Sequence, residues 1–186
     1  MDAIDMMMEE HKNIKRALVA IRKLCIEILD NKKVDTELFY NIVDFVRNYS
    51  DKHHHSKEET ILFKKMSEEL GERIANGPIY GMLAEHDLGR LYMMNLENAL
   101  KDFEAGNLDA RVDIIANAIS YTDLLNRHID KEDTAIYMFA KKRLSNESLE
   151  EINKKCKEVE EKAKENNIQN KYINFINHLE KITSNL

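Results

Sequence analysis

Two segments far apart in the chain carry the same order of polar residues. Residues 54–60 contain His-x-x-Lys-Glu-Glu-Thr, and residues 128–134 repeat it as His-x-x-Lys-Glu-Asp-Thr. Each segment places a histidine four residues before a glutamate, His54 before Glu58 and His128 before Glu132. Residues four apart lie on one face of a helix, so the pattern predicts two helices that each present a histidine and a carboxylate together.

Two further histidines stand alone in helical segments, and each follows a glutamate. Four helices that supply His, His with Glu, His, and His with Glu can enclose two metal ions, because imidazole and carboxylate are both metal ligands. The predicted metal ligands are His11, His54, Glu58, His86, His128 and Glu132.

The number of these residues favours metal binding over chance burial. A single histidine on an apolar face is usually a core residue with satisfied nitrogens. Here three otherwise apolar helix faces each hold a histidine, and such groups meeting in a core without a metal would bury charge at high cost. Six ligands exceed the needs of one tetrahedral zinc. They suit two non-heme iron ions, oxo- or carboxylate-bridged, with Glu58 and Glu132 as the bridging carboxylates.

The second helix leaves a choice among three consecutive histidines, His53, His54 and His55. In an α-helix they span about 200 degrees, so they are not expected all to face inward. The upstream apolar stripe leads to His53 as readily as to His54, and the downstream stripe favours His55 paired with Glu59. The match to the fourth helix favours His54 with Glu58.

The lysine of each repeat has a simpler expected role. Lys57 and Lys131 occupy the same place in the two segments. A charged side chain beside an inward-facing pair is expected to lie on the outer, solvated face of its helix.

Composition supports one helical domain, with or without an appendage. The chain has 186 residues, 43% of them hydrophobic and 33% charged, with one Pro and five Gly. Such a chain can bury a core, has few turn-forming residues and suits long solvated helices. The net charge of -6 argues against binding to nucleic acid or to anionic membranes in general.

The sequence also predicts a cytoplasmic protein. No apolar run approaches the ~20 residues that span a bilayer. The acidic N-terminal segment lacks the basic region of a signal peptide. The two cysteines, Cys25 and Cys156, lie far apart and are expected to pack as small hydrophobic residues.

The predicted fold is all-α: an up-down-up-down four-helix bundle over residues 1–143, with a C-terminal helical extension over residues 144–186. Asp35 or Thr36 is expected to cap the second helix, and Gly71 to end it. Asn76-Gly77-Pro78 is expected to be the clearest break, with Pro78 in the first turn of the third helix. The predicted bundle helices span about residues 2–29, 36–70, 79–103 and 114–139.

The extension is predicted to hold two amphipathic helices. A capping-box pattern over residues 148–151 is expected to open a charged helix that runs to about Lys164, and residues 172–182 form the second helix. The extension either covers one side of the bundle or makes a dimer contact, so the chain is expected to be a monomer or a homodimer.

Taken in order, these residues resemble the hemerythrin-like HHE cation-binding family over about residues 1–143. The resemblance implies a four-helix bundle with a non-heme di-iron centre, and it places the ligands at the six predicted positions. It rests on four motifs, Glu10-His11, His54-His55-x-Lys57-Glu58-Glu59, Glu85-His86-Asp87 and His128-Ile129-x-Lys131-Glu132-Asp133.

The chain departs from the oxygen-carrying members of that family in two places. Those proteins have His-x-x-x-His on the third helix, but the residue four after His86 is Arg90. Their last carboxylate follows its histidine by five residues, which is Asp133 here, whereas Glu132 fits the repeat better. The five-histidine set is therefore incomplete in sequence, and the pattern looks more like the branch with iron-centre repair proteins and the iron-sensing ubiquitin-ligase adaptor.

These observations favour binding or sensing of O2, or of a related diatomic molecule or peroxide. The alternatives are an oxidative or nitrosative stress enzyme that reduces O2, peroxide or NO, and iron donation or repair of iron–sulfur centres. A fourth alternative is a purely structural interaction protein. An enzyme would need a separate electron-donor protein, because the chain has no flavin or nicotinamide motif. Tyr121 is either a phenol near the centre or a core aromatic residue, and Gly89 either leaves space there or allows close helix packing.

Overall fold

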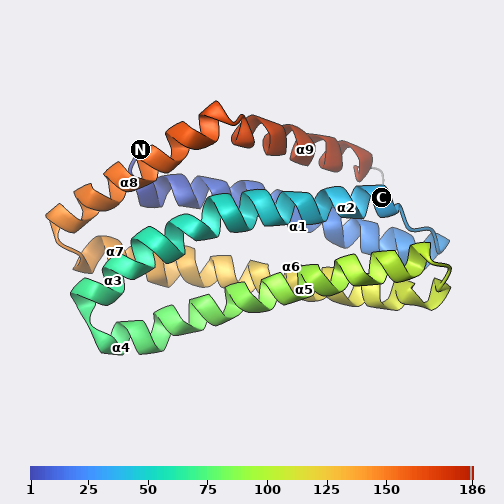
Figure 1. Ribbon diagram of the computed structural model, residues 1–186, viewed down its shortest axis with the longest axis horizontal. Helices are drawn as coiled ribbons and strands as arrows, with labels where there is room; N and C mark the ends of the chain where they lie inside the picture. Colours follow the sequence, from blue (N-terminus) through green and yellow to red (C-terminus); the bar gives the residue numbers. More distant parts are fainter. Residues whose placement is uncertain (185) are drawn as a thin grey trace.

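The computed structural model describes residues 1–184 and 186, and it is helical throughout (Figure 1). The described residues contain no β-strand. Six helical rods are separated by non-helical residues, and they span residues 3–31, 36–70, 72–104, 108–143, 146–165 and 168–182.

The first four rods lie side by side and run in alternating directions, as Figure 1 shows. Several rods contain π-helical turns, in which hydrogen bonds join residues five apart. The first rod is α1 (Ala3–Asn31). The second rod comprises α2 (Thr36–Phe45), the π-helical η1 (Val46–His55) and η2 (Glu58–Leu62), and α3 (Phe63–Leu70). The third comprises α4 (Glu72–Ile74), the π-helical η3 (Ala75–Ile79) and α5 (Tyr80–Glu104). The fourth comprises the 3-10 turn η4 (Leu108–Ala110), α6 (Arg111–Lys131), the π-helical η5 (Glu132–Ile136) and α7 (Tyr137–Arg143).

Side-chain caps and a glycine set the ends of the first two rods. The Asp2 carboxylate accepts a hydrogen bond from the backbone N–H of Asp5 at 2.8 Å and so begins α1. Asp35, one of the two predicted caps, accepts from the N–H of Leu38 at 3.0 Å and begins α2. Gly71 ends α3 as predicted, and its φ of 84° lies in a region that favours glycine.

The predicted break at Asn76-Gly77-Pro78 is wrong. The third rod begins directly after Gly71, and these three residues lie inside η3. Proline removes a backbone donor from a helix interior. A turn of π-helix takes up the irregularity here, so the chain stays helical on both sides of Pro78.

A polar layer divides the core into two apolar clusters. On α1, Met7 belongs to one cluster and Ile14 to the other, with His11 between them. The same order recurs on α5, where His86 lies between Met82 and Met93. The predicted ligands therefore occupy one level of the structure, with hydrophobic packing above and below it.

The C-terminal rods α8 (Asn146–Glu165) and α9 (Ile168–Ile182) cover one side of the other four. Ile152 and Cys156 join one apolar cluster, and Ile176 joins the other. Of the two roles considered for the extension, the structure shows the covering one. Its first helix begins at Asn146 with Ser145 as the cap, three residues before the predicted capping box.

Both cysteines are free and buried. Burial raises the pKa of the Cys25 thiol to about 12 and that of Cys156 to about 11. They pack as small hydrophobic residues, as predicted. Among the described residues, no helix combines the length and the apolar character needed to cross a membrane.

We expect Ile176→Ala to destabilise the protein by about 2–5 kcal/mol, because it removes a fully buried side chain that joins α9 to the core. Urea denaturation followed by circular dichroism measures this loss. The control is Ile182→Ala, at an exposed position of the same helix, with an expected change below about 1 kcal/mol. Equal effects of the two changes would show that α9 does not contribute to the core.

Candidate metal centre

Seven buried side chains from four rods form two groups that share one glutamate. The first group is His11, His54, Glu58 and Glu132, and the second is His55, Glu58, His86 and His128. Within each group the potential ligand atoms lie within 4.8 Å of one another. The structure thus brings all six predicted ligands together and adds His55.

Turns of π-helix present the ligands on two of the rods. The η1 segment ends at His55, η2 begins at Glu58, and η5 begins at Glu132. The two sequence repeats therefore have the same local structure, with a candidate glutamate ligand at the first residue of a π-helical turn. Such turns are common at functional sites.

The three consecutive histidines are all buried, but they do not all face the two groups. His54 faces the first group, His55 faces the second, and His53 is buried beneath α8 beside Glu160 at 3.4 Å. A π-helical turn has more residues than an α-helical turn, so neighbouring side chains diverge by less than 100 degrees. The extension then covers the remaining side.

Each of the five histidines in the groups has a carboxylate at its Nδ1 atom. An ionised carboxylate only accepts hydrogen bonds, so Nδ1 carries the proton and Nε2 keeps its lone pair for the interior. The Nδ1–oxygen distances are 2.7 Å for His11–Asp133, His54–Glu10 and His86–Glu59, 2.9 Å for His128–Glu85 and 3.4 Å for His55–Asp51.

The Nε2 atoms then meet in pairs. His11 and His54 approach at 2.8 Å, and His86 and His128 approach at 2.9 Å. Two lone pairs cannot face each other at such distances unless a proton or a metal ion joins them. Neighbouring ligands at ~2.1 Å from one ion lie about 3 Å apart, so both pairs fit a shared metal.

The two buried glutamates each reach both groups. Glu58 Oε2 lies 3.6 Å from His54 Nε2 and 3.5 Å from His86 Nε2, and Glu132 lies 3.3 Å from His11 and 3.2 Å from His128. Glu58 Oε2 and both Glu132 oxygens are buried without a hydrogen-bond donor. Buried carboxylate oxygens without donors are costly, and cations bridged by the two glutamates would satisfy them. These residues therefore fit a pair of metal ions.

The same contacts shift the pKa values of the ligands. Burial and the nearby Glu132 raise the pKa of Glu58 well above its usual value. Burial opposes ionisation of Glu132, but His128 and His11 lower its pKa well below the usual value. Burial and the charge of His11 lower the pKa of His54 to about 4, whereas Asp133 and Glu132 overcome burial and raise that of His11 to about 8. Without a metal, His11 thus holds a proton at neutral pH, and the environment of Glu58 favours its protonated form.

The family model of the Hemerythrin HHE cation binding domain matches residues 2–140, more than half of the chain. The chain belongs to the hemerythrin HHE family. The resemblance found in the sequence is therefore confirmed, and the two described groups of His and Glu side chains could hold a metal cation. Comparison with curated proteins and with solved structures finds no match.

The sequence of this hemerythrin-like chain leaves open whether His55 is a ligand, and the structure places it in the second group. The downstream stripe that favoured it is buried as expected, with Leu62 and Met66 almost without exposure. Glu59, its suggested partner, instead accepts from Nδ1 of His86. His55 supplies a fifth histidine, although Arg90 stands where oxygen-carrying hemerythrins have one.

Two tyrosines lie at the centre in different ways. The sequence did not single out Tyr137. Its hydroxyl donates to Glu58 Oε1, and its ring stacks on that of His11 with centroids 5.4 Å apart.

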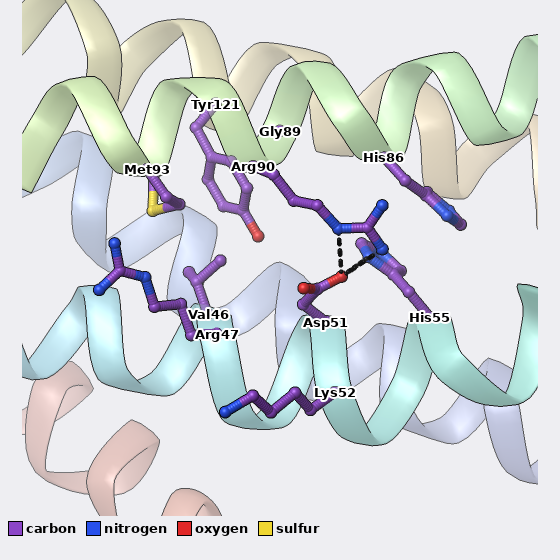
Figure 2. Close-up of a pocket in the computed structure, with 10 residues that line it drawn as sticks. All are labelled: Val46, Arg47, Asp51, Lys52, His55, His86, Gly89, Arg90, Met93 and Tyr121. Carbon is purple, nitrogen blue, oxygen red and sulfur yellow. Dashed lines mark hydrogen bonds and ion pairs between the residues drawn. The ribbon is translucent and has the colours of Figure 1, made fainter.

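The Tyr121 hydroxyl is buried without a partner, and Tyr121 lines a cavity of about 270 Å³ beside His55 (Figure 2). Tyr121 is therefore a core residue whose hydroxyl has no hydrogen-bond partner among the described residues. Its ring also packs against Gly89, where an added Cβ would lie 3.5 Å from it.

The prediction that Lys57 lies on the solvated face is wrong. Lys57 and Lys131 form equivalent ion pairs. Lys57 pairs with Glu10, the carboxylate at His54, and Lys131 pairs with Glu85, the carboxylate at His128. Lys131 is 45% exposed, but Lys57 is fully buried because α8 brings Glu160 against its ammonium group. Hydrogen bonds from His53 and His54 and the charge of Lys57 hold the pKa of Glu10 well below its usual value despite burial.

We expect Lys57→Met to destabilise the protein by about 3–5 kcal/mol, because it leaves Glu10 without its buried cation. The equivalent change Lys131→Met breaks an exposed pair and should cost below about 1 kcal/mol. Urea denaturation of the metal-free proteins measures both changes. A small cost at Lys57 would contradict the network described above.

Proposed function

We propose that the chain is a non-heme di-iron protein that binds or senses O2 or a related diatomic molecule or peroxide. In this proposal the first four rods form the hemerythrin-type four-helix bundle, and α8 and α9 form the extension. The observation that carries it is the position of Glu58 and Glu132 between two sets of imidazole nitrogens, where Glu58 Oε2 and both Glu132 oxygens are buried without a donor.

The donor set favours iron over metals that prefer one kind of ligand. Imidazole with carboxylate suits iron, and two carboxylates can bridge two ions. Iron held there would supply redox chemistry and affinity for small molecules. Five imidazoles and two bridging carboxylates provide fewer donors than two six-coordinate ions need, so positions remain for an added ligand.

The cavity beside the second group supports entry of a small molecule. It is lined by His55 and His86 at one end and by Val46 and Met93 on its apolar wall. The Tyr121 hydroxyl offers an unused hydrogen-bond donor within it. A small, largely apolar molecule can therefore approach the histidines of this group without crossing the packed core.

A reductive enzyme is the second candidate, and Tyr137 favours it. The Tyr137 hydroxyl donates to Glu58 Oε1. Burial and the charge of Glu58 raise the pKa of Tyr137 well above its usual value. Tyr137 therefore keeps its proton and holds it at a carboxylate of the centre. Electrons would come from a separate donor protein. Iron donation is less favoured, because His55 restores a fifth histidine to a buried site.

The test of the proposal is anaerobic loading with Fe2+ followed by admission and removal of O2. We expect two iron ions per chain and a visible absorption band that appears with O2. A band that disappears on removal of O2 supports binding or sensing, whereas one that persists supports the enzyme. The double variant His54→Ala with His128→Ala should lose the iron, and His178→Ala, at an exposed position in α9, should retain it. Iron content unchanged in the double variant would refute the metal centre.

Metal uptake should also release protons. The pKa of His11 is raised to about 8, so at pH 7 the metal-free centre holds a proton on His11 that must leave before this side chain can bind a metal ion. Titration with Zn2+ in weakly buffered indicator dye should therefore show proton release as the chain fills with metal. The release should diminish as the pH rises through 8, because His11 is then already neutral. Release that does not depend on pH in this range would contradict the assignment.

A further inference from the structure

Arg90 is the cation that faces the second group of histidines. Its Nε and Nη2 donate to Asp51 Oδ1 at 2.9 and 2.7 Å, and Nη2 also donates to Glu59 Oε1 at 2.6 Å (Figure 2 shows the pair with Asp51). A third nitrogen, Nη1, donates to Asp87 at 2.9 Å on the same helix. The planar fork of arginine allows one side chain to hold two carboxylates.

These two carboxylates are the partners of two histidines in the same group. Asp51 faces Nδ1 of His55, and Glu59 accepts from Nδ1 of His86. The two rings stack with centroids 3.9 Å apart and planes 9° apart. One arginine therefore supports both rings of this stack, each through its own carboxylate.

Arg90 places its positive charge directly against both carboxylates, with its Nη2 atom 2.7 Å from Asp51 and 2.6 Å from Glu59. An ionised carboxylate holds the proton on Nδ1 and leaves the Nε2 lone pair of the same ring free for a metal. In the first group, the buried Lys57 supports His54 through Glu10 alone.

We propose that Arg90 is the positioning residue of the second group, and that it determines how firmly this group, and not the first, holds its metal. The inference rests on the proposed metal binding. Removing Arg90 would free Asp51 and Glu59 to turn toward solvent, so His55 and His86 would lose their fixed orientation. Arg90 also lines the cavity that reaches these two histidines, so the same side chain lies at the approach to the second group.

The test uses the whole chain loaded with Co2+ as the probe metal, and it compares Arg90→Gln with Arg47→Gln. Arg47 is a matched control: it lines the same cavity, is 44% exposed where Arg90 is 38% exposed, and pairs with Glu97, away from the histidines. Chelation by excess EDTA should remove one of the two ions about 10- to 100-fold faster from Arg90→Gln. The second ion of that variant, and both ions of Arg47→Gln, should leave at the parent rates.

A spectroscopic readout separates positioning from a general loss of stability. In the Co2+-loaded parent we expect exchangeable, paramagnetically shifted N–H signals from all five imidazoles in the proton NMR spectrum. Arg90→Gln should broaden or lose only the signals of His55 and His86. Arg90→Lys, which keeps the charge but lacks the fork, should restore part of the effect.

The outcomes distinguish this inference from the proposed function. A parent that binds no Co2+ would overturn both. A parent that binds two ions, together with unchanged extraction and unchanged signals in Arg90→Gln, would overturn only the role of Arg90. Equal acceleration of both ions would also overturn it, because the effect would not belong to one group.

Discussion

Five hydrogen bonds from imidazole to carboxylate determine the chemistry of this interior. Each fixes the proton on the outer ring nitrogen and turns the inner lone pair toward a centre that already contains two glutamates. A centre with so many acceptors and so few donors is stable only with protons or metal ions among them. The raised pKa values of Glu58 and His11 indicate that protons can take this place, and the cation-binding family indicates that metal ions can.

The polar layer affects how the rest of the fold is stabilised. It divides the apolar core in two, so each cluster must stabilise its own end of the rods. The C-terminal extension contributes to both clusters, since Ile152 packs into one and Ile176 into the other. Its Glu160 also reaches Lys57, which is tied through Glu10 to His54. The C-terminal helices therefore support the candidate metal centre, although they supply no member of the two groups that share Glu58.

Much of this could be read from the sequence, because the decisive patterns are local. A histidine and a glutamate four residues apart share a helix face whatever the remaining chain does, and this spacing located His54 with Glu58 and His128 with Glu132. The missed features depend on irregular or distant structure. His55 turns inward because η1 is wound as a π-helix, which the α-helical period does not reveal. Lys57 is buried because Glu160 arrives from a helix about a hundred residues away in the chain.

The centre is built from two similar halves, and its differences assign different roles to them. Glu10-His11 corresponds to Glu85-His86, and the repeat around His54 corresponds to that around His128, down to the lysine behind each carboxylate.

The two repeats differ at two interior positions. His55 of the first repeat corresponds to Ile129 of the second, and Phe63 corresponds to Tyr137. The second group therefore has an additional imidazole, His55, and lies beside a cavity that Arg90 also lines. The first group has the phenol ring of Tyr137 stacked on His11, and α8 covers it. In the proposed function, this asymmetry would let a small molecule meet one metal position while the other stayed shielded.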